Sequence, residues 1–320
     1  MYNEKLKNEF VSYLKQKRPN DTIDFCITMF EACEPFEVKW GADLCTRNAE
    51  QLAPMVEEIV GLRVKSKWKR IILLKEYVNW CIAIGVPGAC NGMLQVESVG
   101  LKKVRTQMVS SPVHLQKYLD EIFEPEREET VDNIYRCCFW LSYMGVDEED
   151  IVRLKCADVD LARRVLYYRG NEIELYHVSI AAFKNAATLT AFRFKHPNYN
   201  DKVVLRDRAE GDTLIRGIRN APSILAIRSE LSRRSKKALE DGSTQSRISL
   251  QRAKLSGIFY HKYELERAGC PVSFEDVADG FIGDKVYKLD RGRNTQDAKK
   301  RQITNDYMQD YQRWKAAFIV

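Results

Sequence analysis

The sequence has few of the features that mark export, membrane insertion or the common enzyme families. Its N-terminal segment, MYNEKLKNEF, lacks an apolar signal core, and no run of about 18 apolar residues occurs anywhere. Walker loops, dinucleotide-binding glycine patterns, HExxH and GxSxG are all missing. We therefore expect no membrane association, and the widespread hydrolase and nucleotide-binding families have no support.

The CxxC spacing of cysteines is also missing. None of the nine cysteines belongs to a CxxC motif, and most of them lie inside apolar segments. Free thiols of this kind suit a reducing cytoplasm, whereas metal sites and disulfide frameworks need clustered or regularly spaced cysteines. We expect a cytoplasmic protein with no metal and no cofactor.

The charge balance permits nucleic acid as a partner without requiring it. The chain of 320 residues carries 51 Lys and Arg against 45 Asp and Glu, a net charge of +6. This length suits two domains, each large enough to bury its own core. Because the excess of positive charge is small, its distribution along the chain matters more than its total.

Residues 1–90 favour a helical domain. Apolar residues recur at helical spacing in several segments, and nothing in this region indicates a strand. Thr46 or Asn48 is a candidate N-cap, and Ser66 is another. The predicted helices are Asn3–Lys17, Thr22–Ala32, a segment that ends at Ile59, and Lys67–Ile84.

A basic cluster surrounds Trp68, where the last of these helices begins. Helix N-termini present backbone N–H groups to phosphate oxygens, and neighbouring Lys and Arg side chains add attraction. A solvated basic face is the simpler alternative. The cluster consists of Arg63, Lys65, Lys67, Lys69 and Arg70.

Residues 91–112 are expected to link two domains. This stretch lacks sustained periodicity and is closed by Pro112. Its pair Lys102 and Lys103 would suit a linker that passes along DNA, although a basic linker alone is weak support.

Residues 113–320 favour helices with a small amount of antiparallel sheet. Apolar helices are predicted at Val113–Phe123 and Val131–Met144, before a short helix at Glu148–Leu154. A β-hairpin is expected from Val159 to Tyr176, with Gly170 and Asn171 as its turn pair. The predicted fold class is therefore mainly α with a small antiparallel β-sheet, an α+β arrangement.

The elements after the hairpin are mostly helical as well. A second strand pair is predicted between Lys202–Leu205 and Thr213–Ile218. Helices are predicted at Val178–Thr190, at Ser223–Leu239 and from Ser249 to Gly269.

One stretch resembles the start of the catalytic domain of tyrosine recombinases, the phage integrase family. In IYRCCFWLSYMGVDEEDIVRLKCADVD, from Ile134 to Asp160, an apolar helix ends at Gly145, and a Leu and an Asp-Val-Asp segment follow. The family has Gly-x-Arg at that helix end and a Glu three residues later. Here Asp147 stands at the place of the first catalytic Arg, and Asp150 replaces the Glu. The resemblance implies a two-domain clamp around DNA with a degenerate active site.

The family's reaction needs a Tyr nucleophile, two Arg on the non-bridging phosphate oxygens, a Lys acid on the hairpin and further His, Lys or Trp donors. Losing one pre-organised cation typically costs about two orders of magnitude in rate. Asp147 would repel the phosphate, and Arg169 at the hairpin turn cannot act as an acid near neutral pH. The resemblance therefore implies that strand cleavage is lost.

The family's later motifs are also incomplete in this chain. Arg252 or Lys254 occupies the Arg position of the second motif, depending on the register, on a helix that faces DNA or solvent. Asp284 stands at the His of the third motif. Tyr307 is the better match to the nucleophile and Tyr311 follows one turn later, but both fit one apolar helix stripe, which favours core packing.

Basic residues near the C-terminus complete the predicted DNA-binding set. Lys and Arg in such clusters suit contacts to the DNA backbone, which position a protein without specifying sequence. The predicted set is Arg63, Lys65, Lys67, Lys69, Arg70, Lys102, Lys103, Arg169, Arg252, Lys254, Arg291 and Arg293.

The predicted function is sequence-specific binding to operator sites in double-stranded DNA. The expected role is that of a phage or prophage transcriptional repressor that maintains lysogeny in a bacterial host cell, and oligomers on DNA are compatible with it. Two alternatives stay open. An active, divergent recombinase would form a 3′-phosphotyrosyl intermediate through Tyr307 or Tyr311. An adaptor would instead use its basic patches to bind an acidic protein.

Overall fold

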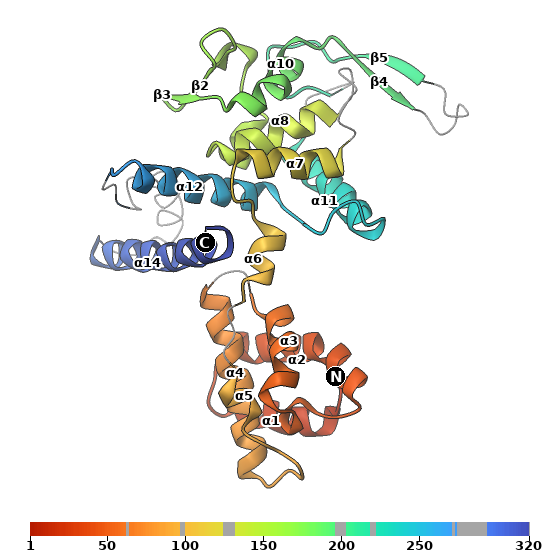
Figure 1. Cartoon of the computed structure of the whole chain (residues 1–320), viewed down its shortest axis with the longest axis vertical. Helices are drawn as coiled ribbons and strands as arrows, with labels where there is room; N and C mark the ends of the chain where they lie inside the picture. Colours follow the sequence, from red (N-terminus) through yellow and green to blue (C-terminus); the bar gives the residue numbers. More distant parts are fainter. Residues whose placement is uncertain are drawn as a thin grey trace. The chain divides into compact units, whose positions relative to one another are not determined.

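The computed structural model describes residues 1–61, 64–96, 100–123, 132–195, 203–217, 222–270, 273 and 293–319. The chain divides into two compact units, coloured along the sequence in Figure 1. Unit 1 comprises Met1–Val104 together with Asn305–Phe318, and unit 2 comprises Arg105–Thr304. The domain limits expected at residues 90 and 112 stay a prediction.

Unit 1 is built from helices, as the sequence predicted. Helix α1 (Glu4–Lys15) packs against α2 (Asn20–Trp40), and α3 (Ala49–Ile59) packs against α2 and the short α5 (Gly92–Gln95). Helix α4 (Val64–Ala83) contacts α2 and α5. Figure 1 shows these helices gathered at the red and orange end of the chain.

Three helix ends in unit 1 differ from, or select among, the predictions. The predicted cap Ser66 is wrong, because α4 begins at Val64 and Ser66 lies inside the helix. The predicted end at Ala32 is wrong, because α2 continues to Trp40 with Pro35 inside it. A proline inside a helix usually costs about 3 kcal/mol. Burial of the apolar residues Met29, Phe30 and Cys33 on the same helix offsets that cost. Asn48 forms a reciprocal capping box with the third residue of α3, which identifies Asn48 as the cap.

The core of unit 1 is aromatic and contains one buried ion pair. Phe10, Phe30 and Tyr77 are fully buried, and the rings of Phe30 and Tyr77 lie 4.9 Å apart. Lys7 and Glu37 pair with no exposed side-chain surface, and Glu37 also accepts the N–H of Leu44. These additional bonds help to compensate the cost of burying two charges.

Unit 2 is organised around one buried helix. Most residues of α8 (Asp132–Tyr143) are buried, and α8 packs against α12 (Leu250–Arg267) and α10 (Ile180–Thr188). Helices α7 (Pro112–Ile122) and α11 (Ile224–Glu240) pack against each other. Figure 1 shows α7, α8 and α12 in the yellow to blue part of the chain.

Two small antiparallel sheets complete unit 2. Strands β1 (Val159–Asp160), β2 (Val165–Tyr168) and β3 (Asn171–Glu174) form the first sheet. Strands β4 (Ala191–Lys195) and β5 (Val203–Asp207) form the second. The predicted fold class, mainly α with small antiparallel sheet, is confirmed.

The second strand pair was predicted wrongly. Strand β5 pairs with β4, whereas Thr213 makes only an isolated bridge to Lys155. Phe192 on β4 is fully buried, and this burial stabilises β4. The short sequence of β4 did not predict it.

The chain also contains the helices α6 (Lys102–Gln107), α9 (Glu148–Ile151) and α14 (Arg293–Phe318). The residues of α14 from Asn305 onwards group with unit 1. Among the helices described, none combines the length and apolar character that crossing a bilayer requires.

Candidate functional site

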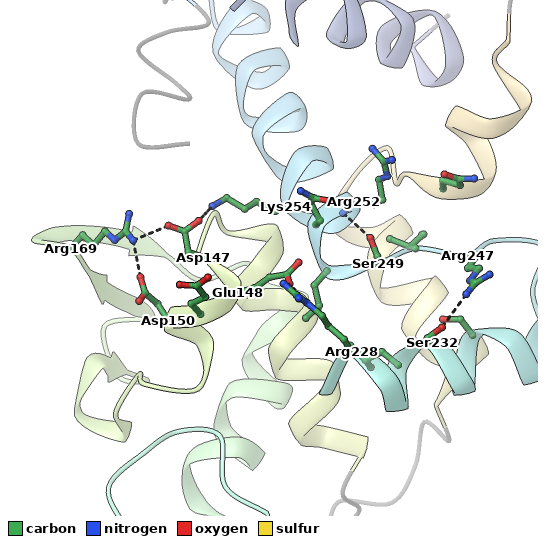
Figure 2. Close-up of a pocket in the computed structure, with 17 residues that line it drawn as sticks. Asp147, Glu148, Asp150, Arg169, Arg228, Ser232, Arg247, Ser249, Arg252 and Lys254 are labelled. Carbon is green, nitrogen blue, oxygen red and sulfur yellow. Dashed lines mark hydrogen bonds and ion pairs between the residues drawn. The ribbon is translucent and has the colours of Figure 1, made fainter. Parts of the chain in front are cut away.

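A cavity of about 1140 Å³ in unit 2 gathers charges of both signs (Figure 2). Its walls come from α9, the β2–β3 turn, α11 and the start of α12. The described lining carries one more cation than carboxylate. The cations are Arg169, Arg228, Arg247, Arg252 and Lys254, and the carboxylates are Asp147, Glu148, Glu149 and Asp150.

The carboxylates neutralise much of one wall. Asp147 pairs through one oxygen with the Nζ of Lys254 and through the other with Arg169, at 2.8 Å. Arg169 also pairs with Asp150 at 2.9 Å. Figure 2 shows Arg169, Asp147 and Lys254 in a row, with Asp150 beside them. The Lys254 side chain is only 7% exposed, so Asp147 supplies a counter-charge that this buried ammonium needs.

The hairpin turn places Arg169 at this wall. Tyr168 and Asn171 form the last strand pair, so Arg169 and Gly170 make the turn, and the predicted turn pair of Gly170 and Asn171 is wrong by one residue. Both turn residues have positive φ, 50° for Arg169 and 78° for Gly170, as a type I′ turn requires. The left-handed conformation costs a non-glycine residue about 1 kcal/mol, which the ion pairs of Arg169 offset.

Tyr168 ties the same turn to α9. Its hydroxyl donates to Asp150 at 2.7 Å and accepts the backbone N–H of Asp147 at 3.2 Å. Burial, and next the carboxylates of Asp150 and Asp147, raise the pKa of Tyr168, so the hydroxyl keeps its proton at neutral pH. This wall is therefore a closed network of hydrogen bonds and ion pairs.

The opposite wall presents cations at the start of α12. The cap residue Ser249 accepts the N–H of Arg252 at 3.3 Å, and the exposed Arg247 donates to the hydroxyl of Ser232 at 3.0 Å. Figure 2 shows Arg247 and Ser232 on the side of the cavity away from Asp147. Arg228 pairs with Glu148 between the two walls. Arg247 was not among the residues predicted from the sequence, although it stands two residues before the predicted helix start at Ser249.

A second group of cations lies in unit 1. Burial and then the charge of Arg70 lower the pKa of Lys103, and burial and then Arg313 lower the pKa of Lys67. The N-terminal part of α4, the start of α6 and α14 thus bring positive charges close to one another. Such mutual repulsion favours the binding of an anion. Arg313 was not predicted, since its neighbours in sequence give no such signal.

The remaining predicted residues of unit 1 occupy defined places. Lys69 and Arg70 lie over the ring of Phe25, with the Lys69 ammonium 4.4 Å from its centre. Lys102 is exposed and pairs with Glu58. An approaching anion can therefore reach at least part of the positive charge of Lys69, Arg70 and Lys102.

Other predicted positions fall outside what the structure describes. Arg63, Asp284 and Arg291 are not among the described residues. Lys65 lies in α4 and Arg293 begins α14, but the description covers neither side chain.

The two candidate nucleophiles are buried. Tyr307 and Tyr311 on α14 are 1% and 0% exposed, and the Tyr311 ring stacks on Trp314, which is also buried. Among the described lining residues of the unit 2 cavity there is no Tyr, His or Cys. The described cavity can therefore hold an anion but offers no tyrosine nucleophile for phosphoryl transfer.

Comparison with known proteins gives one family match, within unit 1. Residues 1–83 match the family model described as MrpR, N-terminal core-binding domain. Among solved structures, XerA recombinase is similar at 13% identity, with 86% of this chain and 88% of that chain covered and a TM-score of 0.38. An integrase from mycobacterium phage Brujita is also 13% identical, over 85% and 82% of the two chains, with a TM-score of 0.31. A search of curated proteins found no match.

Proposed function

We propose that this protein binds double-stranded DNA at specific operator sites through a recombinase-like architecture and does not cut the strands. Its role would be that of a prophage repressor that maintains lysogeny, which the sequence resemblance to the lysogeny repressor of SPβ-like Bacillus prophages also favours. Binding is non-covalent, and both units contribute cations to the DNA backbone.

The composition of the unit 2 cavity carries this proposal. Five cations line it, but its described lining holds no tyrosine, and Asp147 stands where the resemblance places a catalytic Arg. Arg247 and Arg252 supply positive charge without chemistry, as expected for a protein that holds a phosphate backbone.

Unit 1 matches a core-binding domain and carries cations of its own. The family that residues 1–83 match is described as a core-binding domain, and we carry that description over to DNA for this unit. The cations Lys67, Arg70, Lys103 and Arg313 lie within the same unit. A protein with basic sites on two units can hold a duplex through many phosphates, which makes its affinity strongly dependent on salt.

The proposal is tested by recovering the DNA that the intact protein retains. Purified protein is mixed with sheared genomic DNA of a lysogen, the retained fragments are sequenced, and part of the material is run on a denaturing gel. We expect a few related intergenic sites and no adduct that survives denaturation. A covalent adduct would instead identify an active recombinase, and no duplex binding even at low salt would identify a protein adaptor.

Removal of the Arg247 charge tests whether this residue contacts a DNA phosphate. Arg247→Ala should weaken binding to all sequences alike and reduce the slope of log affinity against log salt by about 1, because one phosphate contact is lost. Lys236→Ala, an exposed residue on α11 that pairs with Glu240, is the matched control and should leave the slope unchanged.

A further inference from the structure

The Asp147 side chain does not cap the helix at whose N-terminus it lies. Asp147 is the N-cap of α9, where an Asp side chain normally accepts an N–H from the first helical turn. It makes no such bond. Its two oxygens are turned instead toward Lys254 on α12 and Arg169 on the hairpin turn.

This arrangement matches the way a phosphodiester would be held. A phosphodiester carries one negative charge shared by two non-bridging oxygens, and a carboxylate carries the same charge on two oxygens. Oδ1 of Asp147 accepts from Lys254, and Oδ2 pairs with Arg169 at 2.8 Å. Two cations from separate elements thus each bind one oxygen of a single anion, as charge-assisted bonds to phosphate do.

We infer that the Asp147 carboxylate is an internal substitute for a DNA phosphate, which keeps backbone phosphates away from Lys254 and Arg169. The inference rests on the proposed function, because it assigns a role to Asp147 in DNA selection. Affinity for DNA of arbitrary sequence comes mainly from phosphate contacts. A protein that gives up two such contacts loses non-specific affinity, so a larger share of its binding depends on sequence.

Replacing the carboxylate by its neutral isostere tests this role. Asp147→Asn should bind duplex of an unselected sequence about 10-fold more tightly, with a salt slope steeper by about 1 to 2, since one or two phosphate contacts become available. Affinity and slope are measured by fluorescence anisotropy at several salt concentrations.

Glu149→Gln is the matched control, because it removes one charge from the exposed neighbour of the same short helix. Its effect on affinity should be much smaller than that of Asp147→Asn. Equal gains from the two variants would overturn the inference, because net charge alone would then explain them. An unchanged affinity of folded Asp147→Asn would overturn it as well.

A second variant covers the case in which Asp147→Asn does not fold. Lys254→Met removes the cation and leaves Asp147 in place. If Asp147 excludes phosphate from this position, the salt slope of Lys254→Met should equal that of the wild type. A slope shallower by about 0.9 would mean that Lys254 already contacts a phosphate, which contradicts the inference.

Inorganic phosphate gives a readout that does not depend on sequence-specific binding. Followed by NMR, Asp147→Asn should bind phosphate with shifts at the residues around the hairpin turn, whereas the wild type should show none there. Absence of binding to the variant would overturn the role of Asp147. If the wild type selects no DNA sequence at all, the proposed function fails, but the phosphate titration still decides whether Asp147 fills an anion site.

Discussion

Single charged residues set the electrostatic character of this protein more than its small net charge does. The carboxylate of Asp147 neutralises part of one wall of the unit 2 cavity, through its pairs with Lys254 and Arg169. On α11, Glu230 plays a comparable part, since it accepts bonds from Arg233 at 2.6 Å and from Arg234 at 2.8 Å. Arg234 also pairs with Asp132 at 2.7 Å, so this group joins α11 to α8.

The pH dependence of stability should reveal the Glu230 group. The bond from Arg233, followed by Arg234, lowers the pKa of Glu230 from 4.5 to about 2. A carboxyl whose pKa is lower in the folded state stabilises the fold above its unfolded pKa and loses that effect as the pH falls toward its folded pKa. Because Glu230 is 23% exposed, Glu230→Gln should cost only about 1 to 2 kcal/mol at pH 7.

Urea unfolding at pH 7, 5, 4 and 3 measures this effect. The difference in the free energy of unfolding between wild type and Glu230→Gln should shrink below pH 4.5. Glu240→Gln is the control, since Glu240 is 65% exposed and pairs with Lys236 at 3.6 Å, and it should change stability little at any pH. A difference for Glu230→Gln that stays constant with pH would contradict the assignment.

At the scale of elements, the contact between α12 and α8 defines unit 2. Gly257 on α12 lies so close to α8 that a Cβ at this position would be 1.7 Å from the carbonyl oxygen of Tyr143. Only glycine allows the two helices this approach. The spacing of α12 and α8 therefore fixes where Lys254, one turn before Gly257, meets Asp147.

Gly257→Ala should consequently destabilise unit 2. Helix propensity alone favours Ala over Gly by about 1 kcal/mol, so a loss of stability must come from the packing of α12 on α8. We expect the free energy of unfolding to fall by about 3 kcal/mol. Gln251→Ala, on an exposed position of the same helix, should change it little. Thermal and urea unfolding test both variants, and a melting temperature of Gly257→Ala equal to that of the wild type would be inconsistent with the close contact.

At the scale of the whole molecule, the two candidate nucleophiles belong to the packing of α14. Tyr307 and Tyr311 are buried in the part of α14 that groups with unit 1, and the described lining of the unit 2 cavity includes neither. Tyr307→Phe and Tyr311→Phe should each change DNA affinity by less than about twofold, which corresponds to about 0.4 kcal/mol. Retention of genomic fragments and a denaturing gel check both variants. Loss of a covalent adduct in either variant would reveal an active recombinase.

Local signals in the sequence predicted most helices and the first hairpin. The apolar spacing of α7 and α8 was sufficient, because a helix is specified by neighbours three and four residues apart. The second strand pair was missed because strands pair with distant segments, and the choice of β4 over Thr213 depends on the burial of Phe192. The end of α2 was missed because Pro35 is a strong local signal that burial overrides.

The candidate site was predictable only in part. Motif positions named Asp147, Arg169, Arg252 and Lys254 as candidates, but their spacing in sequence does not reveal that Asp147 meets both Lys254 and Arg169. Arg247 and Arg313 carry no motif and became candidates only through their neighbours in space.

The sequence by itself determined the helical periods and the fold class. These depend on residue identity and on contacts between close neighbours in the chain. The tertiary structure alone decided that Asp147 is paired, that Gly257 brings α12 onto α8, and that Tyr307 and Tyr311 are buried. Such features arise because packing brings together side chains that are far apart in the sequence. Ion pairs and close contacts form only between such neighbours in space.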